Sequence, residues 1–476
     1  MDILNRNWAS RSKTSCKLFL VGVFVPIMID SREEYKKFLE ENWSDDLFLH
    51  LVLTDDREHP FTETPSLILI QNFRTGVLYH LSINHQDAVQ IVSVDEFVSD
   101  VKKFSGRFFV LDKKSILFHL NLGEKLYDIN LGLYLKYDKL LNISDLETVA
   151  HKFIRQNYFS YPLHNKVVPL MKHREQALKI FTQINKLLNN GIFRDKSYLR
   201  INNEIIPILS ELESNKIFVD ELRFKNRFNA KTFGGYVYSQ YNLYTSTGRP
   251  SNRFGGVNYA ALQKDDGSRN CFVSRFGDNG IMMMVDYSAF HPHIICELTN
   301  FPMSLDVDFY AYMAKLCFRK EEIDFQDILD VKALTFRQLY GGVEDEYSHI
   351  KFFYNLNGFI DSHWKEYQSK GYTTTPVFGR KIKNITEPNP SKIFNYILQA
   401  TETEISIPIL GKVNCYLRDK KSKAVIYTYD SVLFDISLDE MEEVRQKLVS
   451  LMKDNDRFPI KCYIGKSYAD LKQISV

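Results

Sequence analysis

The sequence predicts a multidomain protein of mixed α/β and α+β class. Its 476 residues are too many for one ordinary hydrophobic core, and 44% hydrophobic with 25% charged residues is typical of a globular chain. Strand-like and helix-like runs alternate through the first third. Further along, two strand-like runs each end in an aspartate and are separated by helical segments. We therefore expect a small α/β domain followed by a larger α+β region.

The first domain is predicted from seven short segments within residues 18–135. Helix-like segments separate apolar runs of strand length, and Ser31 with Glu34 forms a capping box at the first helix. The strand-like runs are Leu47–Leu53, 66–71, 77–83 and 107–111, and the helix-like ones are 31–42, 94–104 and 114–120.

An apolar run, Leu18–Ile29, precedes these segments and could be mistaken for a signal peptide. It is too short to span a membrane, contains Pro26 and lacks a small-residue cleavage site, so a buried strand is favoured. The six cysteines have no CxxC spacing, which favours reduced thiols over disulfides or a zinc site. The expected location is cytoplasmic, in a bacterial or phage-infected cell, without membrane association.

The remainder of the chain is predicted to be mainly helical around a few strands. Residues 144–216 are predicted to be helical, with a cap at Ser144 and Glu147 and an amphipathic stretch at 173–189. Residues 257–281 favour turns and short strands. A strand is expected at 280–286, a hairpin at 424–437, and helices at 308–317, 325–342, 346–369 and 391–418.

The overall charge of +2 excludes a uniformly basic nucleic-acid-binding protein. A local basic stretch exists between residues 216 and 275, with 10 Lys or Arg against 4 Asp or Glu, a net charge of +6. This stretch is a candidate nucleic-acid groove, and a solvated basic surface is the alternative.

Two aspartates are the candidate catalytic residues. Asp286 follows the apolar run 281–285, and Asp430 follows 425–429. Side by side in one sheet, their carboxylates could hold two divalent ions, which activate an attacking hydroxyl and neutralise a leaving pyrophosphate. Magnesium needs few carboxylates when phosphates and water complete its shell. Taken singly, an aspartate at a strand end is usually a turn residue.

Between them, Lys332, Phe336 and Tyr340 recur at i, i+4 and i+8 and share one helix face. A flexible cation can neutralise a triphosphate, and the aromatic rings can pack on a sugar and base. The alternative is an amphipathic core helix whose lysine reaches out to solvent.

Taken in order, these segments resemble the A-family DNA polymerases, meaning bacterial DNA polymerase I and its phage relatives. The resemblance covers about residue 200 to the C-terminus, and the N-terminal third looks like that family's 3′–5′ exonuclease domain. The matching residues are Thr245-Ser-Thr247-Gly248-Arg249, Arg269, Asp286-Tyr287-Ser288, Lys332, Phe336, Tyr340-Gly341, Gly379-Arg380-Lys381, Asn395, Gln399 and Tyr429-Asp430-Ser431.

The resemblance implies a right-hand polymerase fold that follows an exonuclease-like, RNase H-like α/β domain. The implied domains are a degenerate exonuclease domain at 1–140, a helical connector and thumb remnant at 141–230, palm segments at 231–306 and 376–476, and fingers at 307–375. The implied activity is template-directed DNA synthesis, adding dNTPs to a primer 3′ end on a primed DNA template.

The resemblance also assigns roles to single residues. Two Mg²⁺ ions, for which Mn²⁺ can substitute, are expected on Asp286, Asp430 and the Tyr287 carbonyl. The nucleotide is expected to meet Lys332, Arg269, Phe336, Tyr340 and His291, and DNA to meet Thr247, Arg249, Arg380, Asn395 and Gln399.

Four departures from the family pattern modify these expectations. The strand Leu47–Leu53 carries no carboxylate and Asp112 is the one acid left near the second exonuclease motif, so proofreading is expected to be lost. Arg249 follows Asp220 after 29 positions, too few for the usual thumb, which predicts low processivity or help from a processivity factor or single-strand-binding protein. Ile328 stands where the fingers helix usually has an arginine.

The fourth departure concerns sugar selection. His291 stands five positions after Asp286, where the family has a glutamate that excludes a ribose 2′-OH. An imidazole is bulky enough to block that hydroxyl, but the sugar preference stays open. Two other functions therefore remain: RNA synthesis of the single-subunit polymerase or primase type, since those enzymes end in H-D-S, and a catalytically weak DNA-binding scaffold in a replication complex.

Overall fold

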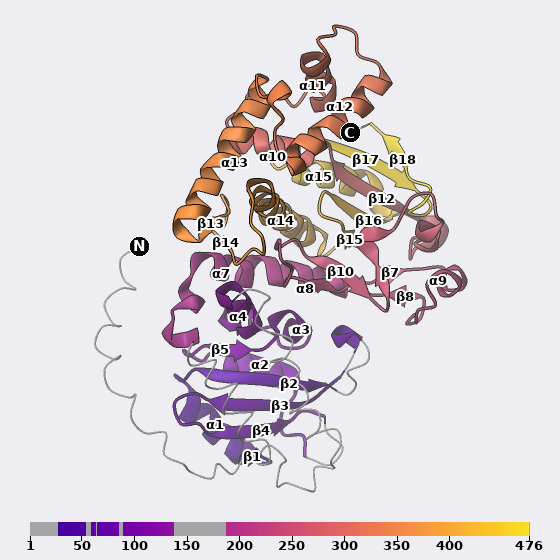
Figure 1. Cartoon of the computed structure of the whole chain (residues 1–476). Coiled ribbons are helices and arrows are strands. Elements are labelled where there is room, and N and C mark those ends of the chain that lie inside the picture. Colours follow the sequence, from indigo (N-terminus) through magenta and orange to yellow (C-terminus); the bar gives the residue numbers. More distant parts are fainter. Residues whose placement is uncertain (1–26, 54–58, 63, 85–88, 138–186, 476) are drawn as a thin grey trace.

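The computed structural model describes residues 27–53, 59–62, 64–84, 89–137 and 187–475. An N-terminal sheet domain lies at one end of the molecule, and a larger region built on a second sheet and a long central helix lies at the other (Figure 1). The helices α3 (Lys113–Leu117), α7 (Lys196–Arg200) and α8 (Ile206–Ser214) lie between them. Among the helices of the described residues, none is long and apolar enough to cross a membrane.

The N-terminal domain is a six-stranded mixed sheet in the order β1-β4-β3-β2-β5-β6. Antiparallel pairs join β2 to β3 and β3 to β4, and the other neighbours are parallel. The predicted strand Leu47–Leu53 and the Ser31 cap, which accepts from the Glu34 N–H, are confirmed. The strands are β1 (Ile27–Ile29), β2 (Leu47–Leu53), β3 (Pro65–Asn72), β4 (Leu78–Ser82), β5 (Phe108–Val110) and β6 (Leu126–Asp128), and the helices are α1 (Arg32–Asn42), α2 (Val94–Val101), α3 (Lys113–Leu117) and α4 (Ile129–Tyr137).

The connector contains α7 (Lys196–Arg200), one π-helical stretch (Ile201–Ile205) and α8 (Ile206–Ser214). The capped helix expected at residue 144, and most of the amphipathic stretch expected at 173–189, lie outside the described residues.

A buried polar cluster joins the two regions. The Glu213 carboxylate, on α8, accepts a hydrogen bond from the Lys114 ammonium of α3 at 2.5 Å. It also lies 3.4 Å from Nε2 of the His59 ring. The Tyr241 N–H donates to the same carboxylate at 2.6 Å. Because Glu213 is 1% exposed, these contacts compensate a charge that has lost its water.

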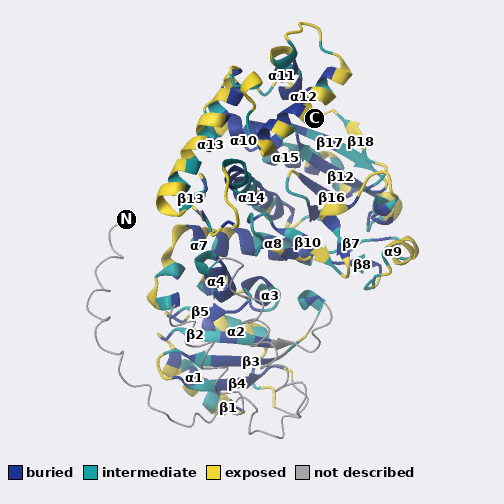
Figure 2. Ribbon diagram, viewed as in Figure 1, coloured by how far each residue is buried: buried dark blue, intermediate teal, exposed yellow. Residues whose placement is uncertain are grey.

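The second region is built on a five-stranded antiparallel sheet in the order β15-β16-β12-β17-β18. One sheet face packs on helices α14 (Pro390–Leu417) and α15 (Met441–Met452), and β12, β15 and β16 are mostly buried, whereas the edge strand β18 is largely exposed (Figure 2). The predicted strand at 280–286 and hairpin at 424–437 are confirmed. The strands are β12 (Gly280–Tyr287), β15 (Lys423–Tyr427), β16 (Ser431–Ser437), β17 (Ile460–Gly465) and β18 (Lys472–Ile474).

Above this sheet lie α10 (Phe290–Leu298), α11 (Phe309–Phe318), α12 (Phe325–Gly341) and α13 (Lys351–Lys370) (Figure 1). The three predicted helices in this part are present. The one expected from residue 346 begins at Lys351, because Asp345–Tyr347 forms a 3-10 turn first. A capping box between Asp324 and Asp327 fixes the start of α12. The hairpin β13 (Tyr372–Thr374) and β14 (Lys381–Lys383) follows α13.

The stretch between Asp220 and Arg249 contains one helix, α9 (Glu221–Phe228), which Asp220 caps. It is followed by the short strands β8 (Tyr236–Val237) and β9 (Tyr241–Asn242). A reduced thumb was predicted for this stretch, and a helix of 8 residues, about 12 Å long, agrees with it. The remaining short strands are β7 (Ile217–Phe218), β10 (Ser251–Phe254) and β11 (Val257–Asn258).

Candidate active site

Adjacent strands bring the two predicted catalytic aspartates together. In the antiparallel pairing of β12 with β16, Asp286 is opposite Ser431, so Asp430 lies at the same end of the sheet. The Tyr287 N–H donates to the Asp430 carbonyl at 2.8 Å. The turn that presents Asp430 requires a left-handed backbone at Tyr429, with φ of 72°. The prediction that both carboxylates share one sheet edge agrees with this geometry.

Asp286 is half-buried, Asp430 is exposed, and each carboxylate has a like-charged neighbour. Burial, and then the charge of Asp430, raises the pKa of Asp286 to about 7. Burial, and then the charge of Glu402, raises the pKa of Asp430. Among the described residues neither carboxylate has a lysine or arginine within ion-pair distance. This leaves uncompensated negative charge at the sheet edge.

This charge fits a divalent cation. The described residues contain no group of three or more His, Cys, Asp or Glu side chains arranged to hold a metal ion. The site is therefore no all-protein metal cage. Two carboxylates are nevertheless a suitable donor set for Mg²⁺, which keeps water and takes substrate phosphate oxygens as further ligands.

The predicted nucleotide face of α12 lies off the hydrophobic core. Lys332 is exposed, Phe336 is half-buried and Tyr340 is 37% exposed, whereas Val331 and Leu339 make up the buried side of the helix. This amphipathic pattern fits both the predicted nucleotide face and the alternative of a core helix with a solvent-exposed lysine, so the nucleotide role stays a prediction. Lys332 is close enough to Asp286 to oppose the rise of its pKa.

The Phe336 and Tyr340 rings stack on each other, with centroids 5.9 Å apart and an interplanar angle of 4°. Burial, and then the charge of Glu402, raises the pKa of Tyr340 to about 12, so its hydroxyl stays protonated at neutral pH. The stacked pair forms a flat aromatic surface beside the two aspartates.

His291, which is predicted to act in sugar selection, has a neighbouring polar group at each nitrogen of its ring. Its Nδ1 lies 2.7 Å from the Tyr340 hydroxyl, and its Nε2 lies 3.1 Å from Oε1 of Glu402. The imidazole is 7% exposed, so it packs on the buried side of Tyr340. Glu402 was not among the site residues predicted from the sequence. The only signal for it was an acid in the middle of the long apolar helix α14.

The predicted DNA contacts Thr247 and Arg249 lie on the loop that leads to β10. The Arg249 guanidinium donates to Glu402 at 2.7 Å and covers the Tyr429 ring at 4.0 Å. It is 26% exposed, which leaves part of it accessible. The Arg249 N–H donates to the Thr247 hydroxyl at 3.4 Å.

Three further predicted residues have local partners. Arg269 donates twice to the Leu262 carbonyl, at 3.1 and 2.9 Å, and its guanidinium covers the Tyr468 ring. On α14, Gln399 donates to Asn395 at 2.7 Å, and both side chains are half-buried.

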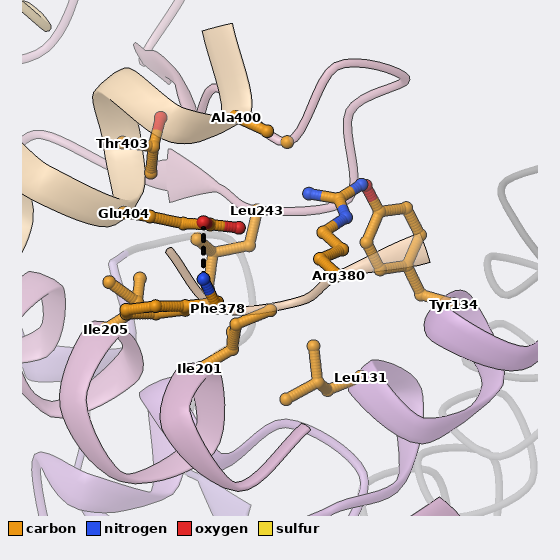
Figure 3. A pocket seen from close by; sticks show the side chains of 11 residues that line it. Leu131, Tyr134, Ile201, Ile205, Leu243, Phe378, Arg380, Ala400, Thr403 and Glu404 are labelled. Atoms are coloured by element: carbon orange, nitrogen blue, oxygen red, sulfur yellow. Dashed lines mark hydrogen bonds between the residues drawn. The ribbon is translucent and has the colours of Figure 1, made fainter. Parts of the chain in front are cut away.

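Arg380 does not lie at the surface that its predicted role requires. It is 8% exposed, and its guanidinium contacts the Tyr134 ring and hydroxyl (Figure 3). Its Nη1 would be 1.7 Å from a Cβ at Gly248, so the guanidinium fills the space under the loop before Arg249. In this conformation Arg380 supports that loop from inside, and its contact with DNA stays a prediction.

The same view shows Glu404 bordering a small pocket beside Arg380 (Figure 3). Its carboxylate accepts from the Thr375 hydroxyl at 2.7 Å and from the Phe378 N–H at 2.8 Å. Burial raises the pKa of Glu404 to about 7, which those hydrogen bonds only partly oppose. Glu402 and Glu404 therefore differ in environment although they share one helix.

The chain is similar to known polymerases in structure and, weakly, in sequence. The POL domain of Pol1 from M. smegmatis, solved in complex with DNA primer-template and dNTP, superposes with a TM-score of 0.65 at 14% identity. The match covers 91% of this chain and 97% of that one. DNA polymerase I of Lactococcus lactis subsp. lactis (strain IL1403) is 22% identical over 261 residues, which cover 46% of this chain. This chain spans 29% of that relative's length. No family profile matches the chain.

The chain thus shares the fold of a polymerase domain, and it brings two aspartates together at one edge of its C-terminal sheet. The fold is that of the polymerase domain of DNA polymerase I, and the predicted resemblance to the A family is confirmed.

Proposed function

We propose that the protein is a template-directed DNA polymerase that adds dNTPs to a primer 3′ end by two-metal nucleotidyl transfer. The supporting observation is the arrangement of Asp286 and Asp430 at one sheet edge, facing the Lys332 and Tyr340 side of α12. In this proposal the aspartates and the Tyr287 carbonyl hold the metal ions, which activate the primer hydroxyl and neutralise pyrophosphate. Lys332 and Arg269 meet the phosphates.

The rest of the site would orient the reactants. Phe336 and Tyr340 present a flat surface for the incoming base and sugar. In this proposal the primer and template would meet Arg249, Thr247, Asn395 and Gln399. A processivity factor or single-strand-binding protein would supply the grip that α9 is too short to provide.

We also propose that the N-terminal domain does not proofread. The strand β2 contains no carboxylate, and the Asp112 carboxylate caps α3 by accepting from the Ser115 N–H and hydroxyl. Since that acid has a structural role and no second acid stands on β2, a metal pair has no ligands there. A mismatched, 3′-labelled primer should keep its label when incubated with the protein and Mg²⁺ in the absence of dNTPs.

Primer extension tests the main proposal. Wild type and Asp430→Ala are compared on a short primed DNA template with Mg²⁺, with dNTPs in one reaction and rNTPs in another. Extension with dNTPs that Asp430→Ala abolishes supports a DNA polymerase. Extension with rNTPs would support the RNA polymerase alternative, which Tyr429-Asp430-Ser431 favours because it is close to H-D-S.

A third outcome would favour a scaffold. Intact binding of primed DNA with no extension of either kind would indicate that the polymerase fold serves only to hold DNA. The product length at low enzyme concentration reports processivity, and short products are expected from the small thumb.

A further inference from the structure

Glu402 is a buried acid in direct contact with residues from two distant parts of the chain. It is 1% exposed, and its two oxygens are shared between His291 of α10 and Arg249 of the loop before β10. A carboxylate without water in an apolar helix costs free energy unless it is paired. The helix around it is mostly apolar and buried. An apolar side chain would fill the same space without the free-energy cost of burying a charge.

The carboxylate is charged in this setting. Burial alone would raise the pKa of Glu402, but His291 and Arg249 together hold it below the usual value. The Glu402 carboxylate lies 3.1 Å from Nε2 of the imidazole, and Nδ1 on the other side of the ring lies 2.7 Å from the Tyr340 hydroxyl. Glu402 therefore fixes the position of a hydrogen bond one ring away.

The contacts of Glu402 extend to both walls of the site. On one side they run through His291 to Tyr340, which stacks on Phe336. On the other side Arg249 covers the Tyr429 ring, and Tyr429 precedes Asp430. One carboxylate thus orients the aromatic surface of α12 and supports the turn that carries a candidate metal ligand.

The spacing along α12 indicates which part of a nucleotide would meet Tyr340. Lys332 and Tyr340 are eight residues apart on one face, about 12 Å at the rise of an α-helix. A triphosphate that reaches Lys332 and the aspartates would place its sugar near the Tyr340 end of that face. The hydroxyl held by His291 would therefore lie against the sugar, where a 2′-OH is present or absent.

We propose that Glu402 is the positioning residue for sugar selection: it fixes His291, and through it Tyr340, so that a deoxyribonucleotide fits and a ribonucleotide does not. This inference rests on the proposed polymerase function. It assigns the carboxylate that acts on sugar selection to α14, next to His291 of α10.

The matched pair Glu402→Gln and Glu404→Gln tests this. Both changes remove one buried carboxylate from the same helix, but Glu404 contacts Thr375 and Phe378 and has no contact with His291. The primary readout is the ratio of kcat/KM for dNTP to that for the matching rNTP. The second readout is the ratio of the two Kd values in a ternary complex with a 3′-dideoxy-terminated primer, which needs no catalysis.

Glu402→Gln is expected to lower both ratios about tenfold, because a neutral amide fixes the imidazole beside Tyr340 less firmly than a carboxylate does. Glu404→Gln should keep the wild-type ratios, and Glu402→Asp should restore part of the selectivity. Wild-type ratios in a folded Glu402→Gln protein would overturn the proposal. Failure of the wild type to add any nucleotide would instead overturn the proposed function.

A second pair covers the case in which Glu402→Gln does not fold. His291→Gln interrupts the path to Tyr340 but leaves the Glu402–Arg249 pair intact. Its control is His293→Gln, a buried histidine two positions along α10 whose ring packs on Phe309. Selectivity should fall in His291→Gln alone, and equal selectivity in both variants would overturn the proposal.

Discussion

The Tyr287 N–H donates to the Asp430 carbonyl at 2.8 Å, one residue beyond the last pair of the β12–β16 ladder. This single bond ties the backbone after Asp286 to the turn that carries Asp430. The two carboxylates are consequently fixed by main-chain geometry, and their mutual repulsion does not separate them. The sheet holds the acids in a position that is unfavourable in the absence of a cation.

Asp286→Asn should therefore separate activity from stability. Loss of a metal ligand is expected to reduce dNTP addition by about 10³-fold or more. The same change removes a half-buried charge whose pKa is raised to about 7, so thermal unfolding at pH 8 should show a gain of roughly 1 to 3 kcal/mol. Asp278→Asn, in the exposed turn before β12, is the control and should change neither property. A stability loss in Asp286→Asn would contradict the electrostatic account.

Lys332→Ala should weaken nucleotide binding, because the exposed ammonium is expected to meet the triphosphate. We expect kcat/KM for dNTP to fall about 100-fold, mainly through KM, with Lys332→Arg recovering part of it. Lys315→Ala on α11 removes another exposed lysine nearby and serves as the control. Equal kinetics in the two alanine variants would exclude this role for Lys332.

Gly248→Ala should damage the loop that carries Arg249. A Cβ at this position would be 1.7 Å from the Arg380 guanidinium, and φ is +77°. Gly256→Ala has a similar backbone, with φ of +85°, but no atom within 4 Å, so it isolates the conformational cost of about 1 kcal/mol. Chemical denaturation should show a larger loss for Gly248→Ala, by about 1 kcal/mol or more, together with weaker binding of primed DNA. Equal losses of stability in the two variants would mean that the Arg380 side chain moves aside at no measurable free-energy cost.

Stability should also depend on pH through Glu404. Its folded-state pKa of about 7 lies above the usual value of 4.5, so the folded protein binds the extra proton. The stability of wild type relative to Glu404→Gln is therefore highest below about pH 4.5 and falls as the pH rises to about 7. Urea unfolding at pH 5 and pH 8 measures this difference. A pH-independent difference between the two proteins would show that Glu404 is ionised in the fold throughout.

The sequence was most informative where local pattern and chemistry agree. The strand before Asp286, the hairpin at Asp430 and the helix of Lys332 were each predictable from periodicity. The shared sheet edge of the two aspartates was predicted from their places at the ends of two strand-like runs. The strands β17 and β18 were not predicted, because short strands next to polar turns carry little periodic signal. The partners of His291 could not be foreseen either. Glu402 lies 111 positions further along the chain, and only the packing of α14 against α10 brings the two together.

Arg380 was assigned to DNA from its place in a motif, whereas the structure buries it against Tyr134. A long side chain with a planar cation can serve a surface or a packed interface equally well, and only burial distinguishes the two. The position of an arginine in a motif therefore does not by itself establish whether its side chain faces a ligand or a packed interface.

The cluster of Glu213, Lys114 and His59 has a consequence for the modularity of the molecule. Glu213 lies in the C-terminal region, whereas Lys114 and His59 belong to the N-terminal sheet domain. Excising the N-terminal domain would remove the Lys114 counter-charge and expose the Glu213 carboxylate, with the apolar surface around it, to water. The N-terminal domain thus acts as the cover and counter-charge of its neighbour, and a chain shortened to the C-terminal region alone should be less stable than the whole.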